Sequence, residues 1–222
     1  FSPIVNIVGE HATYHKRFDA PLTSDIEGIA SRVSDWVGTS SGPESIALDA
    51  ARAVYEASTA PGRIASLVAP ADATWLDGAE IAPPMLVNQR SQASEEAIAK
   101  AAQLVANDEP TLLLLTGRAL RADALEMAGR IARKHGNVQV MAQTSNGRIE
   151  RGHGRFPVER VPYPVQQALD KLSPFRSVIL VGAKEPVAFF AYPGRPSGLL
   201  PEGTVVHRMA TIADDAADAL GR

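Results

Sequence analysis

The chain has 222 residues, of which 45% are hydrophobic and 21% charged, with no cysteine and a formal net charge of −3. This composition is ordinary for a folded protein, and the length suffices for one large domain or two modest ones. The lack of cysteine excludes disulfides, cysteine-ligated zinc, iron–sulfur clusters and thiol nucleophiles, and it fits a reducing compartment such as the cytoplasm.

The charge is unevenly divided along the chain. Residues 1–90 carry 6 basic and 11 acidic side chains, a net charge of −5, whereas residues 91–222 carry 16 and 14, a net charge of +2. This balance argues against a general electrostatic hold on nucleic acid. No apolar run approaches the roughly 20 residues of a membrane span, and the first residues lack the basic segment of a signal peptide. We therefore expect a cytoplasmic protein that binds neither nucleic acid nor membrane.

The first part of the chain predicts a small α/β unit. Residues 3–8 are apolar and β-branched and predict a buried strand, while residues 64–69 predict a second strand. Apolar residues at helical spacing predict a helix over residues 44–58, and a short helix is expected around Asp25–Ala30. Such a unit is too small to cover both faces of its own sheet.

Residues 76–94 break this pattern. The segment contains Gly78, Pro83, Pro84 and Asn88 and shows neither a helical nor a strand period. We interpret it as a semi-rigid connection between two domains.

The second half alternates helices and strands. Ser94 is the expected N-cap of the first helix, with two glutamates in its first turn. The predicted helices cover residues 94–107, 119–134, 165–172 and 212–220, and the predicted strands cover residues 111–116, 138–141, 177–181 and 204–207. Alternating elements with continuously apolar strands predict an α/β fold with a doubly wound parallel sheet, helices lying on both faces.

Two turns of this predicted sheet are candidate binding sites. Thr116–Arg121 joins a strand to a helix and offers a glycine and two arginines, which suit phosphate. Gly182–Pro186 follows another buried strand, residues 177–181. Neither turn carries the complete dinucleotide or Walker fingerprint. A structural turn therefore competes with nucleotide binding at both positions.

Three further stretches have a functional and a structural interpretation. The glycine-rich loop Asn146–Arg155 holds three arginines and a histidine that could clamp an anion, or it is a solvated surface loop. The aromatic run Ala188–Tyr192 could contact a flat ligand or pack against a neighbouring domain. His11 and His15 are four residues apart but lack a third metal ligand at a usual spacing.

No motif of the chain defines a reaction by itself. The Gly-x-Ser-x-Gly turn of serine hydrolases is absent, and the segment Pro193–Gly198 is typical of a rigid turn. The residues alone therefore predict an α/β protein with ligand loops.

Several segments resemble thiamine-diphosphate-dependent enzymes of the acetolactate synthase type. Pro3–Thr13 and Ala20–Ile26 are similar to the later part of the pyrimidine-binding domain of that family, and Ile64–Asp72 is similar to the strand that closes it, ending in Pro-x-Asp. The second half resembles the family's Rossmann-like central domain, a six-stranded parallel sheet; the matching segments are Thr111–Arg121, Arg148–Gly154, Pro157–Arg160 and Phe189–Pro196.

The resemblance implies a particular domain organisation. Residues 1–76 would be the C-terminal part of a pyrimidine-binding domain, residues 77–93 a linker, and residues 94–222 a central domain. In the family, the glutamate that activates the aminopyrimidine ring lies upstream of the matching part. The Gly-Asp-Gly motif that holds Mg²⁺ and the diphosphate lies downstream, and no such motif occurs in this chain.

The implied function is that of a parent enzyme, a lyase or transferase that uses thiamine diphosphate and Mg²⁺. Such an enzyme adds the thiamine C2 carbanion to a 2-oxo acid and releases CO₂, with or without carboligation, as in acetolactate synthase or benzoylformate decarboxylase. This chain would be a structural, inactive fragment of that parent. Its expected partners are the missing flanking domains and further subunits of a homo-oligomer, and the parent's substrate is a small 2-oxo acid.

The resemblance also marks candidate site residues. No catalytic or metal-binding residue is expected in the chain, but His11 would lie in a loop that faces the substrate. Central domains of some family members bind FAD or ADP, which by position makes Gly117, Arg118 and Gly182 candidate cofactor-binding residues. A stand-alone, non-catalytic nucleotide-binding or regulatory module is the alternative function.

Overall fold

The computed structural model describes residues 1–222, and the chain divides into two compact units, Phe1–Gln89 and Arg90–Arg222. The division falls inside the segment that the sequence suggests as a linker. Each unit is built on its own parallel sheet, which confirms the predicted α/β class. None of the helices combines the length and the apolar character that crossing a bilayer requires.

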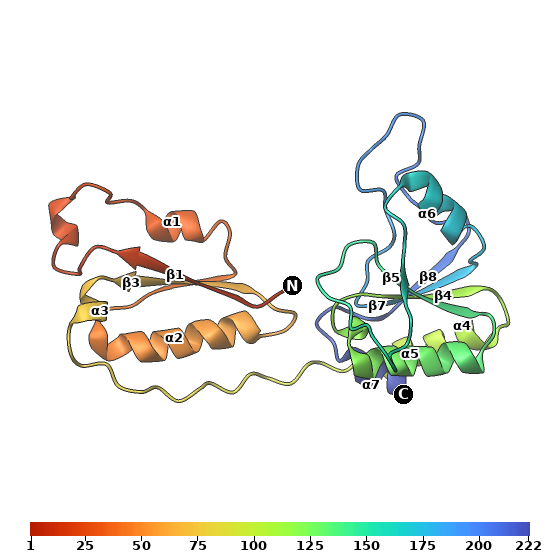
Figure 1. The fold of residues 1–222 in the computed structure, drawn as a ribbon, viewed down its shortest axis with the longest axis horizontal. Helices are drawn as coiled ribbons and strands as arrows, with labels where there is room; N and C mark the ends of the chain where they lie inside the picture. The colour runs from red at the N-terminus through yellow and green to blue at the C-terminus, as the bar shows by residue number, and fades with distance from the viewer. The chain divides into compact units, whose positions relative to one another are not determined.

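The first unit contains a three-stranded parallel sheet in the order β1-β3-β2. The strands are β1 (Ile4–Glu10), β2 (Trp36–Thr39) and β3 (Ile64–Pro70); the helices are η1 (Lys16–Phe18), α1 (Ile26–Ala30), α2 (Pro43–Ser58) and α3 (Asp72–Trp75). In Figure 1, α1 and α2 lie on opposite faces of this sheet.

The helix α2 forms the small core of the first unit. Pro43 occupies its first turn, where a missing N–H costs nothing, and Ala53 and Ala57 face the central strand. These alanines pack against Ala65 and Leu67 of β3. The predicted helices at Asp25–Ala30 and 44–58 are therefore confirmed to within one residue.

Residues 3–8 are predicted to form a buried strand, and the predicted burial is wrong. They do form β1, but β1 is an edge strand that pairs with β3 alone, and the side chain of Ile7 is 72% exposed. The buried strand of this unit is β3, which has a partner on each side. The sequence pattern also missed β2, a four-residue edge strand.

The second unit contains a five-stranded parallel sheet in the order β6-β5-β4-β7-β8. Its strands are β4 (Thr111–Leu115), β5 (Val138–Ala142), β6 (Glu159–Arg160), β7 (Ser177–Val181) and β8 (Val205–Ala210). Its helices are α4 (Glu95–Ala106), η2 (Gly117–Leu120), α5 (Ala122–Lys134), α6 (Val165–Leu172) and α7 (Ala216–Gly221). The two-residue β6 was not predicted, and the resemblance implied six strands, whereas the structure has five.

Alternating side chains of the buried strands build two separate cores. On β4, Leu113 and Leu115 face the core beneath α4, α5 and α7, whereas Leu112 and Leu114 face the core beneath α6. Figure 1 shows α4, α5 and α7 on one side of the sheet and α6 on the other. Helices on both faces explain why these strands are continuously apolar, and they confirm the doubly wound arrangement.

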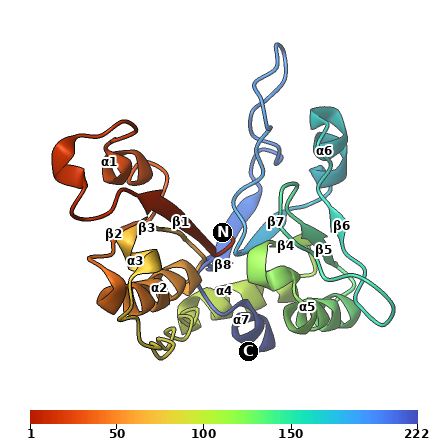
Figure 2. The same ribbon diagram turned by 60° about the vertical axis from the view of Figure 1, so that its left-hand side comes forward.

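Local signals decide where the helices of the second unit begin. The Ser94 hydroxyl accepts a hydrogen bond from the Ala97 N–H at 3.1 Å and so caps α4, as its sequence predicts. The helix predicted over residues 119–134 starts later, at Ala122, because Gly117–Leu120 first forms a separate 3₁₀ turn. The connection between β7 and β8 projects away from the sheet (Figure 2).

Candidate functional site

The candidate site of the second unit lies at the carboxyl ends of β4 and β7. These strands are neighbours in the middle of the sheet, and from them the chain continues to opposite sides, to β5 and to β8. Such a switch point is where open α/β sheets usually bind ligands. Gly117 follows β4 and Gly182 follows β7, so the structure brings two of the three candidate cofactor-binding residues together.

Both glycines are needed for the backbone path at this edge. Their φ angles are 60° for Gly117 and 69° for Gly182, in the left-handed region that favours glycine. A Cβ on Gly117 would lie 2.7 Å from Cδ1 of Ile212, and a Cβ on Gly182 would lie 3.1 Å from the carbonyl oxygen of Thr116. Ile212 therefore packs directly over the turn in which phosphate binding is predicted.

Two arginines, Arg90 and Arg118, lie at this edge. Arg90 donates hydrogen bonds to the carbonyl oxygens of Ile212 and Ala213, at 3.3 and 3.4 Å. Burial lowers the pKa of Arg90, the nearby charge of Arg118 lowers it further, and Asp215 opposes both effects. Arg118, the third candidate residue, also forms an ion pair with Asp123 at 3.7 Å.

Gln143, which follows β5, is a residue of this edge that sequence reasoning missed. Its side-chain Oε1 accepts a hydrogen bond from the backbone N–H of Lys184 at 3.1 Å. Its carbonyl oxygen accepts a hydrogen bond from the Asn146 amide at 2.8 Å. Its position directly after a buried strand was the available signal, because carboxyl ends of parallel strands meet at one edge.

Side chains of the glycine-rich loop Asn146–Arg155 connect it to neighbouring segments of the second unit. Glu150 accepts a hydrogen bond from the Ala122 N–H at 2.8 Å and lies 3.4 Å from Arg148 and 3.7 Å from Arg121. Arg151 donates to the carbonyl oxygen of Val158. These contacts favour the structural interpretation of the loop over an anion clamp.

His11 lies in the first unit, in the loop that follows β1. Its Nε2 is 3.1 Å from the carbonyl oxygen of Pro21, and its backbone N–H donates to the Glu10 carboxylate at 2.7 Å. The rings of His11 and His15 are 5.5 Å apart. No group of three or more His, Cys, Asp or Glu side chains is placed to hold a metal ion.

Asp72 holds this loop in place. The carboxylate accepts hydrogen bonds from the backbone N–H of Thr13 at 2.9 Å and from its hydroxyl at 2.5 Å, and the residue is only 4% exposed. These bonds lower the pKa of Asp72, because they stabilise the charged carboxylate. The Pro-x-Asp ending of β3 was visible in the sequence, but its role as the anchor of the His11 loop was not.

The aromatic run Ala188–Tyr192, for which a flat ligand or a neighbouring domain is the expected partner, forms a cluster at the projecting β7–β8 connection. The ring centroids of Phe189 and Phe190 are 4.8 Å apart. The ring of Tyr163 lies 5.5 Å from that of Phe189, and the ring of Tyr192 lies 6.4 Å from that of Phe190. All four side chains are largely exposed.

The residues of this chain do not fit the binding of thiamine diphosphate by themselves. A diphosphate held through a divalent cation needs clustered oxygen ligands, and no such cluster exists here. The Gly-Asp-Gly motif is also absent from the sequence. No reaction step through this coenzyme follows from the present side chains.

The structure matches solved thiamine-diphosphate-dependent enzymes over nearly its whole length. They are a Mycobacterium smegmatis protein assigned as such an enzyme (21% identity, TM-score 0.75), 4-hydroxybenzoylformate decarboxylase of Rhodococcus jostii RHA1 (18%, 0.73) and benzoylformate decarboxylase of Polynucleobacter necessarius (18%, 0.74). The matches cover 98–99% of this chain and 44–45% of those chains. The fold is thus that of a segment of this class of enzymes.

The sequence agrees with the fold. IlvX of Mycobacterium tuberculosis, assigned as an acetolactate synthase large subunit, is 40% identical over 218 residues, which are 98% of this chain and 41% of IlvX. No protein-family profile matches the chain. The predicted relationship to thiamine-diphosphate-dependent enzymes of the acetolactate synthase type is therefore confirmed, and the chain spans less than half the length of these relatives.

Proposed function

We propose that this chain is part of a thiamine-diphosphate- and Mg²⁺-dependent enzyme that decarboxylates a 2-oxo acid, with or without joining the product to a second carbonyl. The observation that carries the proposal is the 40% identity to IlvX across 98% of the chain. The solved decarboxylases with the same fold support the reaction class. The 222-residue chain itself is proposed to be structural and inactive, since it holds no site for the diphosphate.

Within this enzyme, the first unit would present the His11 loop toward the substrate. Asp72 would act as a positioning residue, because it fixes Thr13 and thereby the backbone of the loop. The second unit would act as a scaffold that associates with the flanking domains and with further subunits.

The test is an assay of CO₂ release from pyruvate and from benzoylformate with thiamine diphosphate and Mg²⁺. We expect the 222-residue chain to release none and the complete protein from its natural source to release CO₂ only when the coenzyme is added. With pyruvate, formation of acetolactate rather than free acetaldehyde would assign a carboligase. CO₂ release by the 222-residue chain would refute its inactivity, and none by the complete protein with either acid would refute the 2-oxo acid proposal.

A second candidate function is the binding of ADP or FAD at the β4–β7 edge. The observation that favours it is that Arg90 and Arg118 lie near each other beside the Gly117 turn. Calorimetric titration of the chain with ADP and with FAD tests it. Micromolar binding that is lost in Arg118→Ala would support it, and absence of heat with both nucleotides would reject it in favour of a scaffold.

A further inference from the structure

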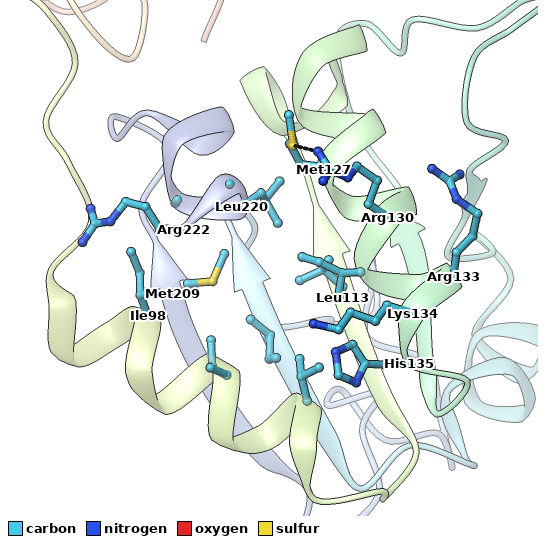
Figure 3. A pocket seen from close by; sticks show the side chains of 17 residues that line it. Ile98, Leu113, Met127, Arg130, Arg133, Lys134, His135, Met209, Leu220 and Arg222 are labelled. Atoms are coloured by element: carbon cyan, nitrogen blue, oxygen red, sulfur yellow. Dashed lines mark hydrogen bonds between the residues drawn. The ribbon is translucent and has the colours of Figure 1, made fainter.

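A groove of about 800 Å³ lies on the face of the second unit's sheet that carries α4, α5 and α7. Beneath it lie Leu113, Ile179 and Met209 from three neighbouring strands, each no more than 6% exposed, and its walls come from α4 and α5 (Figure 3). Neither Gly117, nor Arg118, nor Gly182 lines it. The groove is therefore separate from the candidate site at the β4–β7 edge, and a ligand in it would not touch that site.

Small side chains on α4 leave this space open. Ala101 and Ala102 face the groove at positions where larger apolar residues would fill it. The apolar lining and the volume are those of a pocket for one small molecule, since such pockets span about 300–1,000 Å³ and are mostly apolar with few polar groups.

The arginine and lysine side chains of the groove give it positive charge. Its lining contains Arg130, Arg133, Lys134, His135 and Arg222 but no aspartate or glutamate. Arg133 is paired with Glu126 at 2.7 Å, and Arg222 is paired with Asp218 and Glu95. Arg130 and Lys134 form no ion pair.

Figure 3 separates the cations of α5 by direction. Lys134 extends into the groove beside His135, whereas Arg133 points away from it. Cations at the end of a helix are favoured by the helix dipole, which explains their presence on α5. The dipole does not explain a lysine that reaches over an apolar surface without a carboxylate partner. An anionic group bound there would complete the site.

We propose that this groove binds an amphipathic anion, a carboxylate on an unbranched apolar chain. The apolar chain of the ligand lies between the partly exposed Ile98, Val105 and Ile131 of α4 and α5, where it is removed from water. Its carboxylate pairs with Lys134, with Arg130 as the second cation.

The experiment is calorimetric titration of the 222-residue chain with decanoate below its critical micelle concentration. Decyltrimethylammonium is the probe with the same tail and the opposite charge. We expect one decanoate per chain, and no saturable binding of the cation. Lys134→Gln should weaken decanoate binding about tenfold, which corresponds to about 1.4 kcal/mol. Its matched control is Lys100→Gln, which changes an exposed lysine of α4 outside the groove.

A second pair of variants tests the apolar part. Ala102→Trp places a large side chain in the groove from an exposed position and should abolish binding, whereas Ala99→Trp, exposed on α4 outside the groove, should not. Circular dichroism confirms that each variant is folded. The proposal is overturned if decanoate does not bind saturably, if the cation binds equally well, or if Ala102→Trp binds normally. It is also overturned if light scattering shows a dimer that Ala102→Trp dissociates, because a second copy then occupies the groove.

Discussion

Gly117 and Gly182 show how single residues define the edge of the larger sheet. Both have positive φ, and both approach atoms from other segments so closely that a Cβ would touch them. At Gly182 the nearest atom is a backbone oxygen, which cannot rotate away, whereas at Gly117 it is the flexible end of Ile212. The backbone conformation, rather than the contact, therefore dominates at Gly117.

Gly117→Ala should destabilise the protein by about 1–2 kcal/mol, which is the cost of a left-handed conformation for a residue with a Cβ. Urea unfolding of the second unit measures this free energy. Gly136→Ala is the matched control, because Gly136 has no positive φ and open space around it. If Ile212→Val in the same chain restores full stability, the contact rather than the backbone is the cause.

The lowered pKa of Asp72 makes the stability of the first unit depend on pH. Its pKa in the folded state is lowered from the ordinary value of 3.8 by the bonds to Thr13, so the folded state binds this proton more weakly than the unfolded state. The carboxylate therefore contributes stability above pH 3.8, and that contribution is lost as the pH falls through the lowered pKa.

Asp72→Asn should lower the melting temperature of the first unit at neutral pH and make its stability less dependent on pH in the acidic range. Thermal unfolding at several pH values measures both effects. Asp77→Asn changes an exposed aspartate of the same unit and should do neither. An unchanged pH profile in Asp72→Asn would remove Asp72 as the anchor of the His11 loop.

At the scale of elements, α5 depends on a residue from a distant loop. The residue at its N-cap, Arg121, provides no side-chain acceptor, and Glu150 supplies one by accepting the Ala122 N–H. The negative charge of Glu150 also complements the positive end of the helix dipole. The glycine-rich loop is thereby connected to the start of α5.

Glu150→Ala should destabilise the second unit by about 1 kcal/mol, the usual cost of removing a helix N-cap. Amide hydrogen exchange should also show faster opening of the first turn of α5. Glu202→Ala, which removes an exposed glutamate from a turn, is the control. Equal stability of the two variants would show that Glu150 does not cap α5.

At the scale of the whole molecule, two compact units are connected by an irregular segment. Residues 76–89 form neither helix nor strand, and Ile81 is 99% exposed. Each unit has its own sheet and its own buried apolar cluster. Exposed backbone without regular hydrogen bonds is where proteases cut first.

Limited digestion with thermolysin should therefore cut first between residues 76 and 89 and leave two resistant fragments. Mass spectrometry identifies the fragments, and calorimetry of the intact chain should show two unfolding transitions. Ile81→Ser with Leu86→Ser removes preferred cleavage residues and should slow the first cut without changing the transitions. A single cooperative transition would contradict independent units.

The sequence by itself indicated the relationship to thiamine-diphosphate-dependent enzymes, the parallel α/β class and the bounds of the strongly patterned elements, such as residues 165–172 and 177–181. Continuous apolar runs and helical spacing are local signals, and they hold wherever both faces of a strand are covered. Tertiary structure alone decided that β1 is an exposed edge, that Ile212 packs over the Gly117 turn, and that α4 and α5 flank a cationic groove. These features depend on which segments become neighbours in space, and no spacing along the chain encodes that.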